Sequence, residues 1–296
     1  MLPPPFTQEL VNRLECLRLR TRKEFLGSRS GSYASPRRGT SLEFADYRRY
    51  SPGDDLRYLD WGVYARTDRL YLKLFREEVD LFVYLFVDAS ASMAFPNPKE
   101  KFTPACHVAL ALAYVVLANH DHVKLHLLQE PAPAASPFYQ GRYKITDLVR
   151  LVAAASAAGK IDMGALVAEH LKKLRRPGKA ILLSDFLMPA SEYQRGLNVL
   201  RGFNLDISII QVLSRAELEP SFPRGGLTVV DSESGEEKKL LWSDRVEQAY
   251  RKNLERHNRE IRSFCHQAGI RYSLFVTDQD LADYVLKALP AVGLFK

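Results

Sequence analysis

The apolar run at residues 81–87 constrains the fold of this chain more than any other stretch. Its sequence, LFVYLFV, is rich in aromatic and Val side chains, and an acid and two hydroxyls follow it at once, Asp88, Ser90 and Ser92. A continuous apolar run of this length is typical of a strand buried on both faces inside a parallel sheet. We therefore expect an α/β fold in which these polar side chains emerge at the carboxyl end of the strand, where ligands bind.

The three polar side chains have the chemistry of a cation site. One carboxylate and two hydroxyls at alternate positions offer oxygen ligands, which suit a hard divalent cation such as Mg²⁺. The pattern is short, however, and an ordinary turn or helix cap uses the same residue types. A second apolar strand candidate, residues 180–183, ends in Ser184 and Asp185. Two strand ends can thus bring oxygens to one crevice.

Three segments resemble a known family. FVDASASM resembles the metal-ion-dependent adhesion motif of von Willebrand factor A-type domains, and ILLSDFL resembles their later strand with a further acidic residue. Residues 42–73, LEFADYRRYSPGDDLRYLDWGVYARTDRLYLK, closely resemble the signature upstream of such a domain in the bacterial family called domain of unknown function 58. The resemblance runs from about residue 20 to the C-terminus. It implies a doubly wound, mostly parallel sheet flanked by helices, and partnership with MoxR-type AAA+ ATPases.

The resemblance also implies a ligand set. Asp88, Ser90 and Ser92 would bind Mg²⁺ or Mn²⁺ directly, and Asp185 would bind it through water. In such domains a threonine before the next helix completes the site, but Ile161 stands at that position and has no donor oxygen. Asp162 would either replace it as a ligand or act as the helix N-cap. The cation site is therefore weakened, altered or lost.

The signature segment is dense in Arg, Asp, Tyr and Trp. Its candidate functional residues are Arg48, Tyr50, Gly53, Asp54, Asp55, Arg57, Asp60, Trp61 and Arg66. Charge-assisted hydrogen bonds among them, with the Tyr and Trp rings as apolar anchors, would brace the segment against the sheet. The alternative is a surface that docks a partner. We favour the brace, because intramolecular ion networks are the commoner use of mixed charges.

The 296 residues, of which 46% are hydrophobic, suffice for one large domain with an appendage. We expect an N-terminal region at residues 1–78, with a helix, a basic and aromatic segment and some β content, packed on the main domain. The main α/β domain would span residues 79–296, with a hairpin inserted near residues 225–242. Ser191 and Gln194 have the spacing of a capping box for a helix that ends near residue 200.

The sequence favours a cytoplasmic protein without a membrane span. The three cysteines are odd in number and far apart, as in chains with reduced thiols. The longest uncharged apolar helix candidate, residues 108–118, is shorter than the ~18 to 20 residues that span a bilayer. The net charge of +7 favours an acidic partner, although such a charge also keeps a protein soluble.

Two other functions are compatible with parts of the sequence. Basic residues threaded through Gly and Ser at residues 18–38 suit nucleic-acid phosphate, but without a stacking pattern a solvated segment is favoured, so nucleic acid is not expected as a partner. The motifs of P-loop, dinucleotide-binding, hydrolase-elbow and zinc-protease enzymes are missing. A metal-dependent hydrolase using the Asp88 oxygens remains the alternative. The favoured function is a non-enzymatic adaptor or co-chaperone that links a MoxR-type ATPase to client proteins. It would dock through the metal-ion-dependent adhesion site, where a partner carboxylate would fill the open coordination position of the cation.

Overall fold

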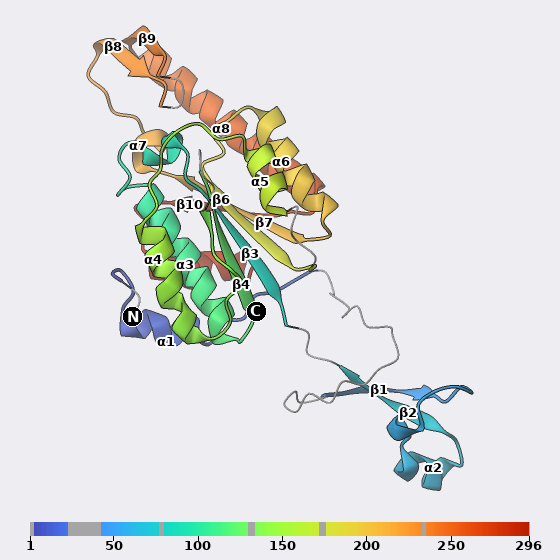
Figure 1. The fold of residues 1–296 in the computed structure, drawn as a ribbon. Coiled ribbons are helices and arrows are strands. Elements are labelled where there is room, and N and C mark those ends of the chain that lie inside the picture. The colour runs from blue at the N-terminus through green and yellow to red at the C-terminus, as the bar shows by residue number, and fades with distance from the viewer. Residues whose placement is uncertain are drawn as a thin grey trace. The chain divides into compact units, whose positions relative to one another are not determined.

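The computed structural model describes residues 3–22, 43–76, 80–129, 134–171, 176–232 and 235–295. Contacts divide the chain into two units (Figure 1). The larger unit combines Met1–Glu24 with Leu81–Lys296, and the smaller unit is Phe25–Asp80.

The larger unit is built on a sheet whose described strands number six, in the order β10-β7-β6-β3-β4-β5. Every neighbouring pair is parallel except β4 with β5. The strands are β3 (Phe82–Asp88), β4 (His122–Leu128), β5 (Ala134–Ala135), β6 (Lys179–Ser184), β7 (Asp206–Leu213) and β10 (Arg271–Val276). The predicted α/β fold with a mostly parallel sheet is thereby confirmed.

The central strand β3 is buried on both faces, as its apolar run predicted. Val83, Leu85 and Val87 belong to the core on one face, and Tyr84 and Phe86 belong to the core on the other. All five side chains are inaccessible to solvent. Burial on both faces explains why this strand shows no alternation of apolar and polar residues.

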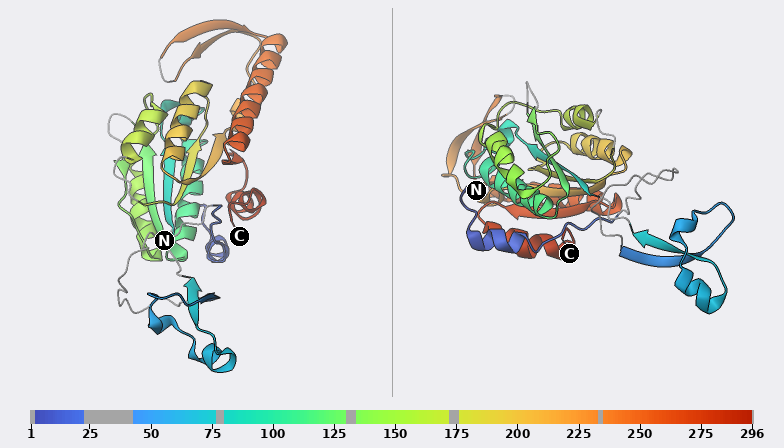
Figure 2. Two further views of the ribbon diagram at one scale, coloured as in Figure 1. Left: turned by 90° about the vertical axis from the view of Figure 1, so that its right-hand side faces the viewer. Right: turned by 60° about the horizontal axis from the view of Figure 1, so that its bottom comes forward.

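Helices cover both faces of the sheet (Figure 2). One core includes residues of α1 (Gln8–Leu14), α3 (Phe102–Ala118), α4 (Ile145–Ala153) and the C-terminal helical segment, α9 (Leu281–Asp283), η4 (Tyr284–Ala288) and α10 (Leu289–Ala291). The other core includes residues of α5 (Met163–Leu171), α6 (Ala190–Gly202) and α8 (Asp244–Gln267). The sheet is thus doubly wound, and α3 is buried nearly all round because it packs within the first core.

The N-terminal helix belongs to the larger unit. Leu10 and Leu14 of α1 are buried in the same core as α3. The chain after α1 reaches the start of β7, where the Arg22 amide donates to Asp206. This division differs from the predicted grouping of the helix with the signature segment in residues 1–78. That the signature segment packs on the main domain stays a prediction.

The predicted hairpin is confirmed. β8 (Gly225–Val230) pairs antiparallel with β9 (Glu237–Trp242), after the short helix α7 (Arg215–Leu218). The Ser243 hydroxyl then caps α8 by accepting from the Val246 amide. The predicted capping box of Ser191 is wrong, because α6 begins at Ala190 after Pro189 and Ser191 lies inside its first turn.

The smaller unit also contains the predicted β structure. Its described residues form the antiparallel pair β1 (Glu43–Arg49) and β2 (Tyr71–Arg76), with η1 (Leu56–Tyr58) and α2 (Trp61–Thr67) between them. Among the described ranges of the chain, no helix is both long and apolar enough to cross a bilayer.

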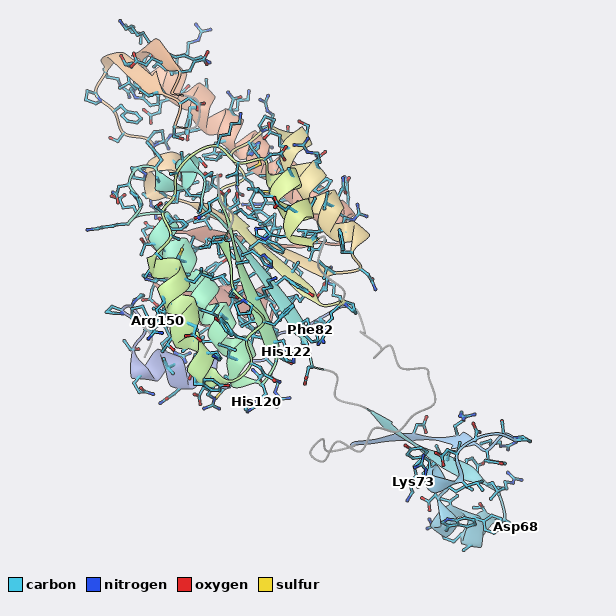
Figure 3. The ribbon with its side chains drawn as sticks, viewed as in Figure 1. Asp68, Lys73, Phe82, His120, His122 and Arg150 are labelled. Atoms are coloured by element: carbon cyan, nitrogen blue, oxygen red, sulfur yellow. The ribbon has the colours of Figure 1, made fainter. Side chains whose placement is uncertain are left out.

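At the amino end of the main sheet, aromatic rings pack across neighbouring strands. The Phe82 ring at the start of β3 stacks on the His122 ring at the start of β4, with 4.5 Å between centroids (Figure 3). The His122 ring therefore packs against the start of the neighbouring strand.

Candidate functional site

The candidate site lies where the winding of the sheet reverses. β3 and β6 are neighbours, but the helix that follows β3 packs on one face and the helix that follows β6 packs on the other. Loops diverge at such a switch point, and ligands of open α/β sheets bind there. Asp88 is the last residue of β3, and Ser184 is the last residue of β6. The sheet therefore brings together the two polar strand ends that the sequence indicated.

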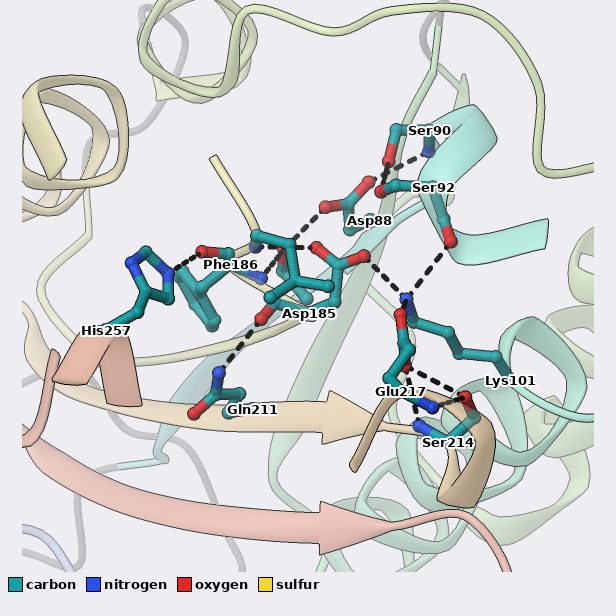
Figure 4. A network of polar contacts seen from close by, with 12 residues as sticks. Asp88, Ser90, Ser92, Lys101, Asp185, Phe186, Gln211, Ser214, Glu217 and His257 are labelled. Atoms are coloured by element: carbon teal, nitrogen blue, oxygen red, sulfur yellow. Dashed lines mark hydrogen bonds and ion pairs between the residues drawn. The ribbon is translucent and has the colours of Figure 1, made fainter. Parts of the chain in front are cut away.

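Asp88 is fully buried and is held by hydrogen bonds to both carboxylate oxygens (Figure 4). Its Oδ1 accepts from the Ser90 amide at 2.8 Å, and its Oδ2 accepts from the Ser184 hydroxyl at 2.5 Å. The Ser90 and Ser92 hydroxyl oxygens lie 3.0 Å apart. The three residues of the D-x-S-x-S pattern thus gather in one cluster, as predicted.

Asp185 faces a lysine. The Lys101 ammonium, just before α3, lies 2.7 Å from Asp185 Oδ2 and 3.1 Å from the Ser92 carbonyl oxygen. It also pairs with Glu217 in α7. Lys101 has 0% and Asp185 1% of its surface exposed. The cluster therefore contains an internal ammonium that sequence reasoning missed.

Burial and charge shift the pKa values of this cluster. Burial, and then the charge of Asp185, raise the pKa of Asp88 to about 6. Burial opposes the charge of Lys101, but Asp185 and Glu217 together outweigh it and raise the pKa of the ammonium. Burial also raises the pKa of Glu217, against the effect of Lys101. Lys101 is therefore a cation at neutral pH. The ionised form of Asp88 is disfavoured by burial and by the charge of Asp185.

The other two predicted ligand positions have different surroundings. Ile161 is buried in the core with α5 and α6 and offers no oxygen. Asp162 directly precedes α5, where its Oδ1 accepts from the Ala165 amide and its Oδ2 pairs with Arg195 at 2.7 Å. The helix-cap role of Asp162 is therefore present, and both its oxygens are engaged.

The donor set consequently fits a divalent cation only in part. Asp88, Ser90 and Ser92 gather their oxygens, but Asp185 is bonded to an ammonium and position 161 supplies no ligand. No group of three or more His, Cys, Asp or Glu side chains that could hold a metal occurs among the described residues. Mg²⁺ or Mn²⁺ binding stays a prediction.

Two apolar side chains are exposed on the loops that leave this site. Phe95 follows the turn after β3, and Leu187 follows β6, and each is 40% exposed. Two hydrogen bonds hold the loop that carries Leu187. The Leu187 amide donates to Asp185 Oδ1, and the Gln211 side chain donates to the Asp185 carbonyl oxygen. The two loops therefore present these large apolar side chains to solvent.

The signature residues form local contacts in the smaller unit. Arg48 pairs with Asp54 at 2.7 Å across the turn that contains Gly53, whose φ of +101° is the left-handed backbone that glycine favours. Arg57 pairs with Asp55, and Arg66 donates to the Gly62 carbonyl.

Asp60 connects both strands of the smaller unit to α2. Its Oδ1 caps α2, and its Oδ2 accepts from Tyr47 and pairs with Lys73. These contacts, led by the Tyr47 hydroxyl, lower the pKa of Asp60 to about 2. Tyr50 is half-buried, whereas Trp61 is 63% exposed. The network braces the unit internally, and its role toward the main domain or a partner stays open.

Comparison with known proteins places the chain in a family. A family model described as "Protein of unknown function DUF58" matches residues 46–263, more than half of the chain. The chain belongs to the DUF58 family. It is similar to the uncharacterized proteins Rv1480 of Mycobacterium tuberculosis and Mb1516 of Mycobacterium bovis, each 26% identical over 283 residues. These alignments cover 94% of this chain and 88% of each relative.

The chain is also similar to solved structures. One is the conserved hypothetical protein BatB from Bacteroides thetaiotaomicron, with 10% identity, a TM-score of 0.41, and 72% of this chain and 98% of that one covered. Another is the SpRpn10 VWA domain, with 15% identity, a TM-score of 0.34, and 45% of this chain and 76% of that one covered.

Proposed function

We propose that this chain is a non-enzymatic interaction module that docks a partner protein at the end of the sheet where β3 and β6 stop. The supporting observation is the buried carboxylate cluster at the switch point beneath loops that expose Phe95 and Leu187. Open α/β folds use this edge for binding. The cluster fixes the two loops, and the exposed side chains supply apolar contact area.

The electrostatics of Asp88 support a functional rather than a purely structural role. The side chain is buried near Asp185, and its raised pKa shows that its ionised form is disfavoured there. A core that only needed packing would be more stable without this charge. Perturbed carboxylates of this kind concentrate at functional sites.

Docking is better supported than hydrolysis. A hydrolase needs a nucleophile beside a base. The Ser90 hydroxyl lies beside both Ser92 and Asp88, but the Asp88 carboxylate already accepts from the Ser90 amide and the Ser184 hydroxyl, so it is not free to act as a base.

The partner we propose is a MoxR-type AAA+ ATPase in the cytoplasm, with the chain acting as an adaptor between the motor and its client proteins. Support for this partner comes from the family resemblance of the signature and adhesion motifs. Most of the basic segment at residues 18–38 lies outside the described residues. Within the described part, the Arg20 carbonyl accepts from Lys179, so this backbone is tied to the sheet.

Affinity measurements test the proposal. The purified chain is titrated with the MoxR-type ATPase of the same organism, and Phe95→Ala and Leu187→Ala are compared with it. If both side chains lie in the interface, each truncation weakens binding about fivefold or more. Tyr143→Ala is the matched control, because Tyr143 is 74% exposed but follows the segment that pairs with the start of β4. No binding by the native chain, or equal losses in all three variants, would overturn the proposal.

A further inference from the structure

We infer that the Lys101 ammonium is the resident cation of the site at the ends of β3 and β6, so that the site is complete without a divalent metal. This role of Lys101 does not depend on which protein docks at the site. Lys101 is not part of the adhesion motif.

The hydrogen-bonding capacity of the ammonium is filled. An ammonium group has three donors. Lys101 directs them to Asp185 Oδ2, to Glu217 Oε1 and to the Ser92 carbonyl oxygen. The three acceptors come from the residue after β6, from α7 and from the turn after β3 (Figure 4). Lys101 therefore joins the ends of β3 and β6, as a cation at this edge would, and also contacts α7.

The carboxylate oxygens that a divalent cation would need are already engaged. Asp185 accepts from the Leu187 amide with Oδ1 and from Lys101 with Oδ2. Asp88 accepts from the Ser90 amide and from the Ser184 hydroxyl. Mg²⁺ requires six oxygen ligands in near-octahedral geometry. It would have to displace several of these bonds.

Charge also acts against a second cation. The ammonium is buried, where like charges repel strongly because screening by water is weak. A divalent ion bonded to Asp185 would lie next to Lys101. The expected threonine, which would add an uncharged oxygen ligand, is replaced by the buried Ile161. The buried ammonium of Lys101 and the isoleucine at position 161 both disfavour the metal. Only the isoleucine can be recognised from the sequence.

The enclosed Lys101 ammonium also bears on how a partner protein would be recognised. If the site held a metal, a partner carboxylate would complete the coordination of that cation. With Lys101 in place, the ammonium is enclosed and has no open position for such a ligand. Docking at this edge would then depend on the exposed loop side chains and not on a bridging metal.

The test compares metal binding by the native chain and by Lys101→Met/Glu217→Gln. The double substitution removes the ammonium and also one of the carboxylates that it neutralises, so that fewer buried charges are left unpaired. Mg²⁺ and Mn²⁺ binding are measured by calorimetry and by the shift in melting temperature. We expect no saturable binding and no shift for the native chain, and a saturable stabilisation of the double variant by Mn²⁺. Asp185→Asn in the double variant should remove that stabilisation.

Two results would overturn the inference. One is one-to-one metal binding by the native chain that Asp88→Asn abolishes, and the other is a folded double variant that gains no metal binding. If the double variant does not fold, hydrogen exchange on the native chain decides. Exchange is measured once with Mg²⁺ and once with chelator. We expect the same protection of the amides at residues 88–95 and 184–188 in both conditions, and added protection there with Mg²⁺ would contradict the inference.

Discussion

The Lys101 ammonium nitrogen lies 2.7 Å from Asp185 Oδ2, with both side chains almost completely buried. The two residues are 84 positions apart in the sequence, and the pair links the start of α3 to the end of β6. A buried ion pair is costly to break from one side, because the remaining charge loses both its partner and its access to water.

Removing Lys101 should therefore strongly destabilise the larger unit. We expect Lys101→Met to lower the free energy of unfolding by about 3–5 kcal/mol, since Asp185 and Glu217 both lose their cation. Urea denaturation measures the change. Lys287→Met is the control, because Lys287 pairs with Asp283 on the surface and is 69% exposed, and its loss should cost less than ~1 kcal/mol. Equal losses in the two variants would contradict a buried role for Lys101.

Asp88→Asn should stabilise the fold at neutral pH. Because burial and Asp185 raise the pKa of Asp88 to about 6 from its usual 3.8, the folded state binds the proton more tightly than the unfolded state. Stability is thus lost as the pH rises from about 4 through 6, by roughly 2–3 kcal/mol in all. The amide can accept from the Ser90 amide and donate to the Ser184 hydroxyl.

The measurement is urea denaturation of both proteins in chelator at pH 4 and pH 7. We expect the variant to be more stable than the native chain at pH 7 and nearly equal to it at pH 4. A variant that is less stable at pH 7 would show that the carboxylate of Asp88 is stabilised by a contact beyond those described.

His126 should make the fold sensitive to acid. Its ring is fully buried, stacks on Phe86 and lies 4.4 Å from the His170 ring between centroids, and neither ring nitrogen of His126 has a described partner. Burial, then His170 and Lys124, lower its pKa from 6.5 to about 2. The unfolded state gains a proton below pH 6.5 that the folded state does not. Stability is therefore present above pH 6.5 and is lost by about 1.4 kcal/mol per pH unit below it.

His126→Phe tests this sensitivity, because the ring keeps the stack on Phe86 and cannot be protonated. Between pH 7.5 and pH 5.0, denaturation should show the native chain losing about 2 kcal/mol more than the variant. The exposed His266→Gln is the control and should follow the native chain. Parallel curves for the native chain and His126→Phe would contradict the prediction.

Gly178 should tolerate no side chain. A Cβ atom at this position would lie 2.0 Å from the Phe82 carbonyl oxygen, which belongs to the backbone at the start of β3 and cannot turn away. We expect Gly178→Ala to cost about 2 kcal/mol or more, through strain between β3 and β6. In Gly202→Ala the new methyl group meets nothing within 4 Å at the end of α6, so stability should be equal or up to ~1 kcal/mol higher. Thermal denaturation of the two variants shows whether the cost at Gly178 comes from the close contact with the Phe82 backbone. If Gly202→Ala costs as much, the loss would not be due to that contact.

The strands and part of the site could be predicted from the sequence because the evidence for them is local. The apolar runs at β3 and β6 place Asp88 and Asp185 at strand ends, and parallel pairing brings those ends to one edge. Lys101 and Glu217 could not be predicted, because a lysine before an apolar helix and a glutamate in a capping box have ordinary local explanations. Their contacts cross 116 positions of the sequence and depend on tertiary packing.

Two features at the starts of α5 and α6 also depend on contacts that the sequence does not show. Ser191 has the spacing of a capping box, but α6 begins at Ala190 after Pro189, two residues earlier than that box requires. Asp162 had two chemically reasonable roles, and the choice depended on Arg195, a residue of α6 that the sequence does not place beside it. Long-range partners, rather than propensities, decide these cases.

The most direct measurement is a hydrogen-exchange footprint of the MoxR-type ATPase on the full chain. We predict added protection in the loops after β3 and β6, at residues 89–96 and 185–190. We predict none at residues 139–144, which lie near the amino ends of the strands. Protection confined to other surfaces, or no change with saturating ATPase, would contradict docking at the ends of β3 and β6.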